Sequence, residues 1–248
     1  MAVLAIVLLV VGIGGPGKAA DLFQRITGVL DQIPRLASAE PTVSQQPTDG
    51  VSPTEADAAR ASLAALTVTT SAPIPPTKYQ RERFGARWAD TDGNGCNQRD
   101  DVLLRDVDKT QPYKMTRQGS CDHDVLGGTW RDPYLGKSLT FTNLKEQKQA
   151  EAIQIDHRVA LATAWRDGAW AWTDAQRLDY ANDLTVLVAV DGPTNANAKS
   201  DKDASRWEPA KPFQCSYAVG IVTVKAKYGL SVHEGERAAL NRQLDTCQ

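Results

Sequence analysis

The chain has 248 residues, and its 28 Lys and Arg residues against 30 Asp and Glu residues give a formal net charge of −2. Apolar residues make up 42% and charged residues 23%, which is typical of a globular protein and excludes a collagen, a wholly disordered chain and a polytopic membrane protein. The near-neutral balance also excludes a strongly basic coat for nucleic acid. We therefore expect any polyanion to bind at a local site that includes a metal ion.

The N-terminal segment 1–20 is predicted to be a signal peptide or a signal anchor. Residues 1–13 are nearly all apolar, and they are followed by a Gly-Gly-Pro-Gly sequence and a small-residue cleavage site. This run is shorter than the roughly 20 apolar residues that cross a bilayer. A buried strand is the alternative. We expect a secreted or cell-envelope-associated protein with no membrane contact beyond this segment.

Residues 21–78 are predicted to form a spacer. From residue 37 onward this stretch is rich in Ala, Pro, Ser and Thr and lacks aromatic residues, so it cannot bury enough apolar surface to offset its conformational entropy. One short Ala-rich helix is expected from Thr54 to about Leu66. Aromatic and basic residues become denser at Tyr79, which predicts a folded domain over residues 79–248.

Apolar and polar patterning within residues 79–248 predicts an α+β fold. Strands are expected near 125–130, 138–142, 152–157 and 184–190. Helices are expected near 100–107, from 159 through 165, and near 195–207, 216–227 and 234–246. The chain contains no visible internal repeat.

All four cysteines lie in this domain. An even number in an exported chain predicts two disulfides. Pairing of neighbours, Cys96 with Cys121 and Cys215 with Cys247, is the simplest of three connectivities, and each bond is expected to stabilise the fold by about 3 kcal/mol. A zinc site is the alternative, but no two cysteines have the close spacing of structural zinc sites.

The segment that begins at Asp90 approximates a calcium-binding loop. Asp90, Asp92 and Asn94 stand at positions 1, 3 and 5 of such a loop, with Gly95 at position 6 and Asp101 at position 12. Position 12 is normally Glu, which is one methylene longer, and no good helix precedes the loop. A Ca²⁺ site and a simple Gly- and Asx-rich turn beside a disulfide therefore both stay open.

Asp156 and His157 end the strand expected over 152–157 and precede a helical run. A carboxylate can hold a hard divalent cation while a neighbouring imidazole takes a proton from water. In a regular strand their side chains point to opposite faces, so both reach one site only if the strand ends or bulges there. A purely structural Asp–His pair is the alternative.

Further polar residues follow in order. Asn182 is expected to open the second strand, and Asn195 and Asn197 lie four and two residues before Lys199. A strand bearing Asp-His, a second strand opened by Asn and a helix bearing Asn and Lys resembles the His-Me finger, or HNH, nucleases. The sequences around Asp156, Asn182 and Lys199 are similar to exported bacterial HNH proteins related to the C-terminal nuclease domain of GmrSD-type restriction enzymes. The likeness, which also includes Asp-Pro-Tyr at 132–134, covers nearly all of residues 79–247.

This resemblance implies a ββα-metal core and a metal-dependent endonuclease that hydrolyses phosphodiester bonds of DNA, or of RNA, with little sequence specificity. His157 would be the general base, and Asn182 would orient its imidazole. Asp156 and one of Asn195 and Asn197 would hold Mg²⁺ or Mn²⁺, because these ions prefer oxygen ligands.

Lys199 and Arg158 would contact phosphates of the nucleic acid, and no stable protein partner is inferred. The family usually places the helix Asn three residues before the Lys, where this chain has Ala. Because Asn195 and Asn197 differ by about 200° around a helix, only one of them can face a metal, and the count from Asn182 favours Asn195. If neither reaches the ion, the alternative is a non-catalytic secreted or cell-surface binding module on a degenerate HNH scaffold, with calcium as a candidate ligand.

Overall fold

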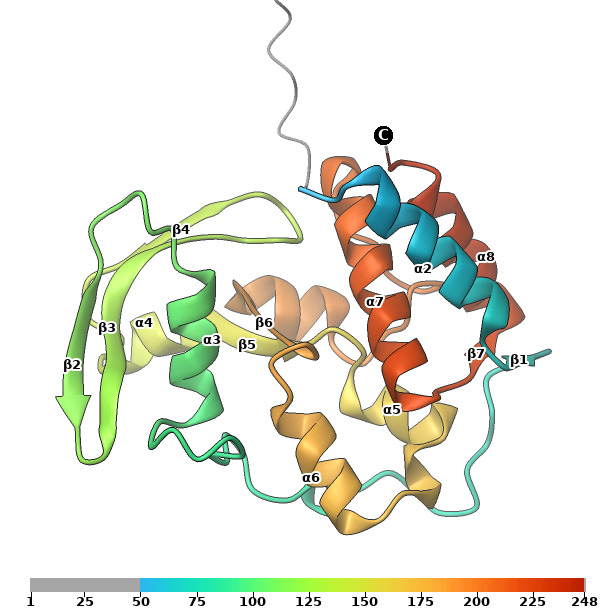
Figure 1. Cartoon of the computed structure of the whole chain (residues 1–248), viewed down its shortest axis with the longest axis horizontal. Helices are drawn as coiled ribbons and strands as arrows, with labels where there is room; N and C mark the ends of the chain where they lie inside the picture. Colours follow the sequence, from blue (N-terminus) through green and yellow to red (C-terminus); the bar gives the residue numbers. More distant parts are fainter. Residues whose placement is uncertain (1–49, 248) are drawn as a thin grey trace, which may run out of the picture. The chain divides into compact units, whose positions relative to one another are not determined.

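A three-stranded sheet, a two-stranded hairpin and a group of helices form an α+β fold in the computed structural model, which describes residues 50–247 (Figure 1). The expected α+β class and the two expected disulfides are both confirmed. The predicted signal segment 1–20 and the first part of the predicted spacer lie outside the described residues. No helix within residues 50–247 is both long and apolar enough to cross a membrane.

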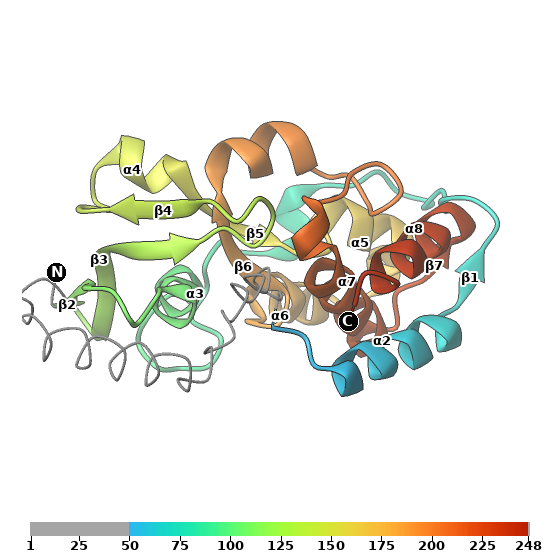
Figure 2. The same cartoon turned by 90° about the horizontal axis from the view of Figure 1, so that it is seen from above.

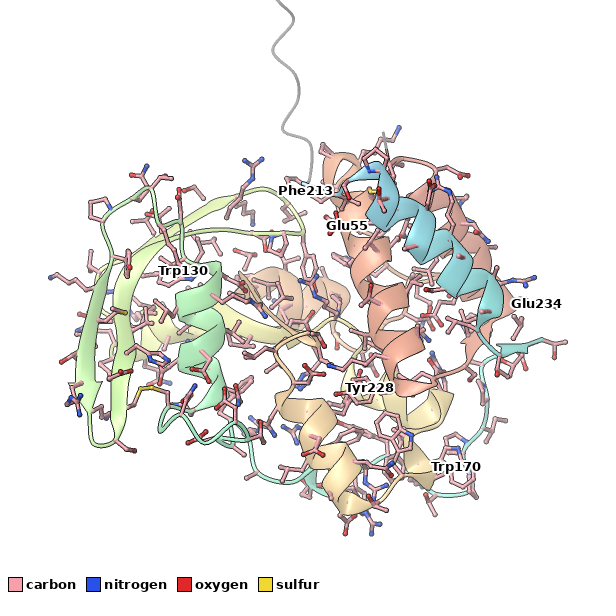
Figure 3. The ribbon with its side chains drawn as sticks, in the orientation of Figure 1. Glu55, Trp130, Trp170, Phe213, Tyr228 and Glu234 are labelled. Carbon is pink, nitrogen blue, oxygen red and sulfur yellow. A yellow bond between two sulfur atoms is a disulfide. The ribbon has the colours of Figure 1, made fainter. Side chains whose placement is uncertain are left out.

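The three-stranded sheet is antiparallel in the order β2-β3-β4, formed by Lys114–Gln118, Cys121–Arg131 and Ser138–Phe141. Helix α3 (Gln98–Asp106) packs against β3 (Figure 2). Trp130 lies between them (Figure 3). The indole nitrogen of Trp130 donates a hydrogen bond of 2.9 Å to the main-chain oxygen of Leu103. Trp130 belongs to an apolar cluster that also contains Ile153 and Ile155 of the two-stranded hairpin. This cluster therefore joins the three-stranded sheet to the hairpin.

The hairpin pairs β5 (Ile153–His157) with β6 (Leu187–Asp191) in antiparallel register, with His157 opposite Leu187. The connection between these strands contains α5 (Leu161–Asp167), the short η3 (Ala169–Ala171) and α6 (Asp174–Asn182). Before β5 stands the short α4 (Gln147–Ala152). After β6 the chain enters η4 (Thr194–Lys199), which is a π-helix.

A group of helices packs beyond the hairpin (Figures 1 and 2). Helix α2 (Pro53–Ala65) lies along α7 (Gln214–Tyr228) and α8 (Glu234–Leu244), with η5 (Lys211–Phe213) leading into α7. Strand β1 (Val68–Thr69) pairs in parallel with β7 (Val232–His233). Another short helix, η2 (Arg81–Phe84), contacts α5 and α6.

Helix α2 belongs to the folded unit. Its Ala59 and Leu63 are buried in the main apolar cluster, and Arg60 donates a hydrogen bond of 2.7 Å to the main-chain oxygen of Leu244. Ser52 and Glu55 form a capping box at its N-terminus. The sequence analysis placed this helix in a spacer, whereas the structure packs it with elements that follow Tyr79.

Several expected elements differ in extent, two of them beside the candidate site residues. The helix expected over 195–207 ends at Lys199, because Ser200 has a φ of 49°, which does not continue a helix. The strand expected from residue 184 begins only at Leu187, so Asn182 ends α6 instead of opening a strand. Helix α6 itself was not predicted, although Thr173 and Gln176 form a capping box at its start.

Both disulfides join neighbouring cysteines, so the simplest connectivity is confirmed. Cys96–Cys121 links the segment before α3 to the start of β3, and Cys215–Cys247 links the first turn of α7 to the residues after α8. The zinc alternative is excluded for these cysteines, because none is free.

Loss of the second disulfide is expected to destabilise the helical group. Replacing Cys215 and Cys247 together by Ser opens a loop with a sequence separation of 32 residues. We expect the free energy of unfolding to fall by about 3 kcal/mol, because the unfolded chain regains conformational entropy. Urea denaturation of the oxidised protein and the double variant measures this difference. A loss below about 1 kcal/mol would contradict it.

Candidate active site

Asp156 lies in β5, and its carboxylate contacts a buried hydroxyl group and a buried ammonium group. Its Oδ2 accepts hydrogen bonds from the Tyr134 hydroxyl and from Lys199 Nζ, the latter at 2.8 Å. Lys199 is fully buried, and its Nζ also donates to the main-chain oxygen of His157 at 3.1 Å. Burial, followed by the charge of Asp156, raises the pKa of Tyr134 well above its usual value, so this tyrosine stays a hydrogen-bond donor.

His157 is the last residue of β5 and is half-buried. Its Nε2 lies 3.0 Å from the main-chain oxygen of Ala181, and the ring of Trp88 stacks on the imidazole with a centroid distance of 6.5 Å. A carbonyl oxygen only accepts hydrogen bonds, so Nε2 carries the proton and Nδ1 of the neutral ring keeps its lone pair. Burial lowers the pKa of His157 to about 4, so the ring is neutral at pH 7.

Asp156 and His157 contact different groups. Strand β5 keeps a regular register, with Asp156 opposite Val188 and His157 opposite Leu187. Because side chains alternate along a strand, the carboxylate faces Tyr134 while the imidazole faces Trp88. The structure therefore brings Asp156 together with Lys199, and no hydrogen bond joins its carboxylate to the His157 imidazole within residues 50–247.

Asn182 holds a backbone segment instead of the imidazole. Its Oδ1 accepts a hydrogen bond of 3.0 Å from the main-chain nitrogen of Ala89, and its Nδ2 donates to the main-chain oxygen of Leu178 at 2.9 Å. The preceding residue, Ala181, supplies the carbonyl that contacts His157. Asn182 thus fixes the chain next to Trp88, whose φ of 56° is a strained conformation for an aromatic residue.

The π-helix η4 places Asn195 and Lys199 against β5. The main-chain nitrogen of Ser200 donates to the oxygen of Asn195 at 2.8 Å, which closes a wider turn than an α-helix does. Asn195 lies four residues before Lys199, one more than in the family pattern, and the wider turn accommodates this extra residue. Asn195 Nδ2 donates to Gln154 Oε1 at 3.0 Å, two residues before Asp156 on the same strand face.

Asn197 is exposed, unlike the half-buried Asn195. Within residues 50–247, neither Asp156 Oδ1 nor Asn195 Oδ1 accepts a hydrogen bond. One carboxylate oxygen and one carboxamide oxygen are donors of the type that Mg²⁺ and Mn²⁺ prefer. In donor chemistry, Asp156 and Asn195 therefore suit a hard divalent cation. Asp203, His233 and Glu236 also lie close enough to one another to hold a metal ion.

A cleft of about 580 Å³ opens next to the end of β5. Its walls include Arg158, which directly follows His157, and Arg131, Asp132, Phe213 and Gly220 (Phe213 is labelled in Figure 3). The guanidinium of Arg131 lies 5.5 Å from the Phe213 ring centroid. The guanidinium of Arg158 makes no hydrogen bond or ion pair within the described part of the chain, and it reaches α7 at Gly220, where a Cβ would stand 2.9 Å from its Nη1.

Sequence analysis missed two side chains that shape this site. Tyr134 belongs to the Asp-Pro-Tyr sequence, which was noticed only as part of a family likeness, and it contacts Asp156 from 22 residues away. Trp88 lies in an irregular segment with no periodic pattern, so nothing in the sequence indicated that it covers His157.

Protonation of His157 is expected to destabilise the fold in acid. Its pKa in the folded chain, about 4, is below the ordinary value of 6.5, so its contribution to stability is complete above pH 6.5 and is lost as the pH falls through about 4. The free energy of unfolding is expected to fall by about 3 kcal/mol, because a difference of one pKa unit between the folded and unfolded chain corresponds to about 1.4 kcal/mol. Urea denaturation at pH 7 and pH 4 measures it, and His157→Gln is the control. An equal pH dependence in both proteins would contradict this assignment.

Comparison with known proteins agrees with these features. Residues 97–243 match the family described as GmrSD restriction endonucleases, C-terminal domain, and the chain belongs to this family. A protein of Arthroderma benhamiae described as an uncharacterized secreted protein is 36% identical over 195 residues, which cover 77% of this chain and 86% of that protein. No solved structure shows significant similarity to the chain.

Proposed function

We propose that this protein is an exported, metal-dependent endonuclease that hydrolyses phosphodiester bonds of DNA, or of RNA, with little sequence specificity. The main support is the imidazole of His157, which is neutral, is held at Nε2 by a main-chain carbonyl and keeps a lone pair at Nδ1. A general base needs this state near neutral pH. Membership of a restriction-endonuclease domain family supports the same reaction class.

Strands β5 and β6 with the helical turn η4 would form the ββα-metal core of this nuclease. The hairpin is antiparallel, and η4 directs Asn195 and Lys199 toward the strand that carries Asp156. Asp156 and Asn195 would hold Mg²⁺ or Mn²⁺, which supplies charge stabilisation at the phosphate and the leaving oxygen.

The protein's own side chains would supply the proton transfer and the contacts with the substrate. His157 Nδ1 takes a proton from the attacking water, while the Ala181 carbonyl stabilises the charged imidazolium through Nε2–H. Lys199 compensates the charge of Asp156 and ties η4 to the end of β5. Arg158 and Arg131 would contact phosphates on either side of the scissile bond from their cleft.

We also propose a secreted or cell-envelope location. Two disulfides require an oxidising compartment, and a relative that matches most of this chain is described as secreted.

A matched pair of variants tests the proposed metal site. Asn195→Ala removes the carboxamide beside Gln154, whereas Asn197→Ala removes an exposed side chain from the same turn. We expect plasmid cleavage in Mn²⁺ to fall by about 10²-fold in Asn195→Ala and to stay within about twofold in Asn197→Ala. Equal activities of the two variants would contradict the metal site.

A non-catalytic module that binds nucleic acid is the second candidate function. It is favoured by the Lys199 ammonium, which already partners Asp156 at 2.8 Å. This candidate predicts that the folded protein retards DNA in a gel without cutting it in any metal. Metal-dependent cleavage would exclude it.

A further inference from the structure

Residues 90–97 fold into a tight loop in which side-chain oxygens cap main-chain nitrogens. Asp90 accepts hydrogen bonds from Gly93 at 2.7 Å and from Gly95 at 2.9 Å. Asp92 accepts one from the main-chain nitrogen of Asn94 at 3.3 Å, and Asn94 accepts one from that of Cys96 at 2.7 Å. These contacts order the side chains at positions 1, 3 and 5 of the loop, but they do not by themselves indicate a ligand.

Two buried oxygens next to this loop accept no hydrogen bond from the part of the chain that the structure describes. Asp101 is 8% exposed and Gln98 is 1% exposed, yet Asp101 Oδ2 and Gln98 Oε1 accept no hydrogen bond within residues 50–247. Both side chains contact the loop through their other polar atoms, because Asn94 Nδ2 donates to Asp101 Oδ1 and Gln98 Nε2 donates to Thr91 Oγ1, each at 3.0 Å. A buried polar atom without a partner costs about 1–3 kcal/mol and requires an explanation.

We propose that residues 90–101 bind one Ca²⁺ ion. Counted from Asp90, the residues that carry these two oxygens, Gln98 and Asp101, stand at positions 9 and 12, the two places where the second half of an EF-hand-type loop contributes ligands. The ion would be held by oxygens of Asp90, Asp92, Asn94, Asp101 and the main chain at Cys96, with Gln98 direct or through water. This site is separate from Asp156 and independent of the proposed nuclease reaction.

The backbone meets the requirements of such a loop. Gly95 has a φ of 89° at position 6, where the loop turns sharply. Helix α3 begins at Gln98, so Asp101 lies in its first turn and faces back toward the loop. The contact between Asn94 and Asp101 shows that the shorter Asp at position 12 already reaches position 5. Cys96, at position 7, is fixed by its disulfide to Cys121.

The local charge also favours a cation. Asp90, Asp92 and Asp101 bring three carboxylates to one loop, and His123 contacts Asp101 Oδ1 at 2.7 Å from outside it. Carboxylates that accept main-chain hydrogen bonds retain lone pairs for a metal. Six or seven oxygen ligands suit Ca²⁺ better than Mg²⁺, which keeps most of its own waters.

Calorimetric titration of the full-length oxidised protein, freed of metal with EDTA, tests this site directly. We expect Ca²⁺ to bind with a Kd of about 10⁻⁴–10⁻³ M, as in extracellular modules. At ten times this Kd, the melting temperature is expected to rise by about 3–6 °C. Absence of binding overturns the proposal. An equal rise in Mg²⁺ in the Asp156→Asn variant, which lacks a ligand of the proposed nuclease metal site, overturns the choice of calcium.

Charge-removing variants locate the ion. Asp92→Asn, on an exposed side chain, and Asp101→Asn should each lose at least half of the Ca²⁺-dependent shift. Asp108→Asn, which changes a half-buried carboxylate that caps Thr110 outside the loop, should keep the shift, and so should Asp156→Asn. A shift that survives in Asp92→Asn and Asp101→Asn, or disappears in Asp156→Asn, would overturn the assignment to this loop.

Discussion

Replacing His157 by Ala is expected to lower the rate of plasmid cleavage by about 10²–10⁴-fold, the usual contribution of a general base. The loss follows because no other imidazole lies near: His123 contacts Asp101, and His233 contacts Asp203. The initial rate of nicking in Mn²⁺ at pH 7 measures the effect. His233→Ala is the control for removal of a histidine outside the site.

Two outcomes distinguish the role of His157 from a structural one. Circular dichroism should show His157→Ala to be folded, because the side chain is half-buried at a strand end and leaves no buried charge behind. A folded variant that cuts within threefold of the natural protein would contradict the general-base assignment.

Replacing Lys225 by Met is expected to lower the free energy of unfolding by about 3–5 kcal/mol. Lys225 is fully buried in α7, and its Nζ lies 2.6 Å from Asp167 and 2.9 Å from Glu236. Without the ammonium, two buried carboxylates lose their shared partner. Burial already raises the pKa of Glu236, so the variant should recover stability as the pH is lowered and this carboxyl takes a proton.

Lys227→Met is the matched control on the same helix. Its ammonium is half exposed and pairs with Asp183 at 2.6 Å, so its loss should cost less than about 1 kcal/mol. Urea denaturation of both variants at pH 7 measures the difference. Equal losses would contradict the buried-charge argument.

Local sequence patterns predicted the elements whose apolar spacing is regular. Strand β5 alternates Ile153 and Ile155 with polar residues, and α3 places Val102 and Leu103 against β3, so both were expected near their observed positions. Strand β2 was not expected, because all five of its residues are exposed and show no apolar alternation. Its pairing depends on the long neighbouring β3.

Local sequence patterns could not predict the geometry of the candidate site, because it depends on turns and on contacts between residues far apart in the sequence. Asn182 precedes an apolar run, which suggested a strand, but Asp183 instead accepts a hydrogen bond from the main-chain nitrogen of Thr185 and turns the chain. The orientation of Asn195 depends on a π-turn, which a period of 3.6 residues does not reveal. The Asp156–Tyr134 contact joins separate elements, so only the fold shows it.

The most direct measurement of the central claim is cleavage of supercoiled plasmid by the full-length oxidised protein in Mg²⁺, Mn²⁺ or EDTA. If Asp156 and Asn195 hold a divalent ion beside His157, nicked and linear DNA should form in Mg²⁺ or Mn²⁺ and neither should form in EDTA. Intact plasmid in every metal, from a protein shown to be folded and to contain both disulfides, would contradict the nuclease and favour a module that binds without cutting.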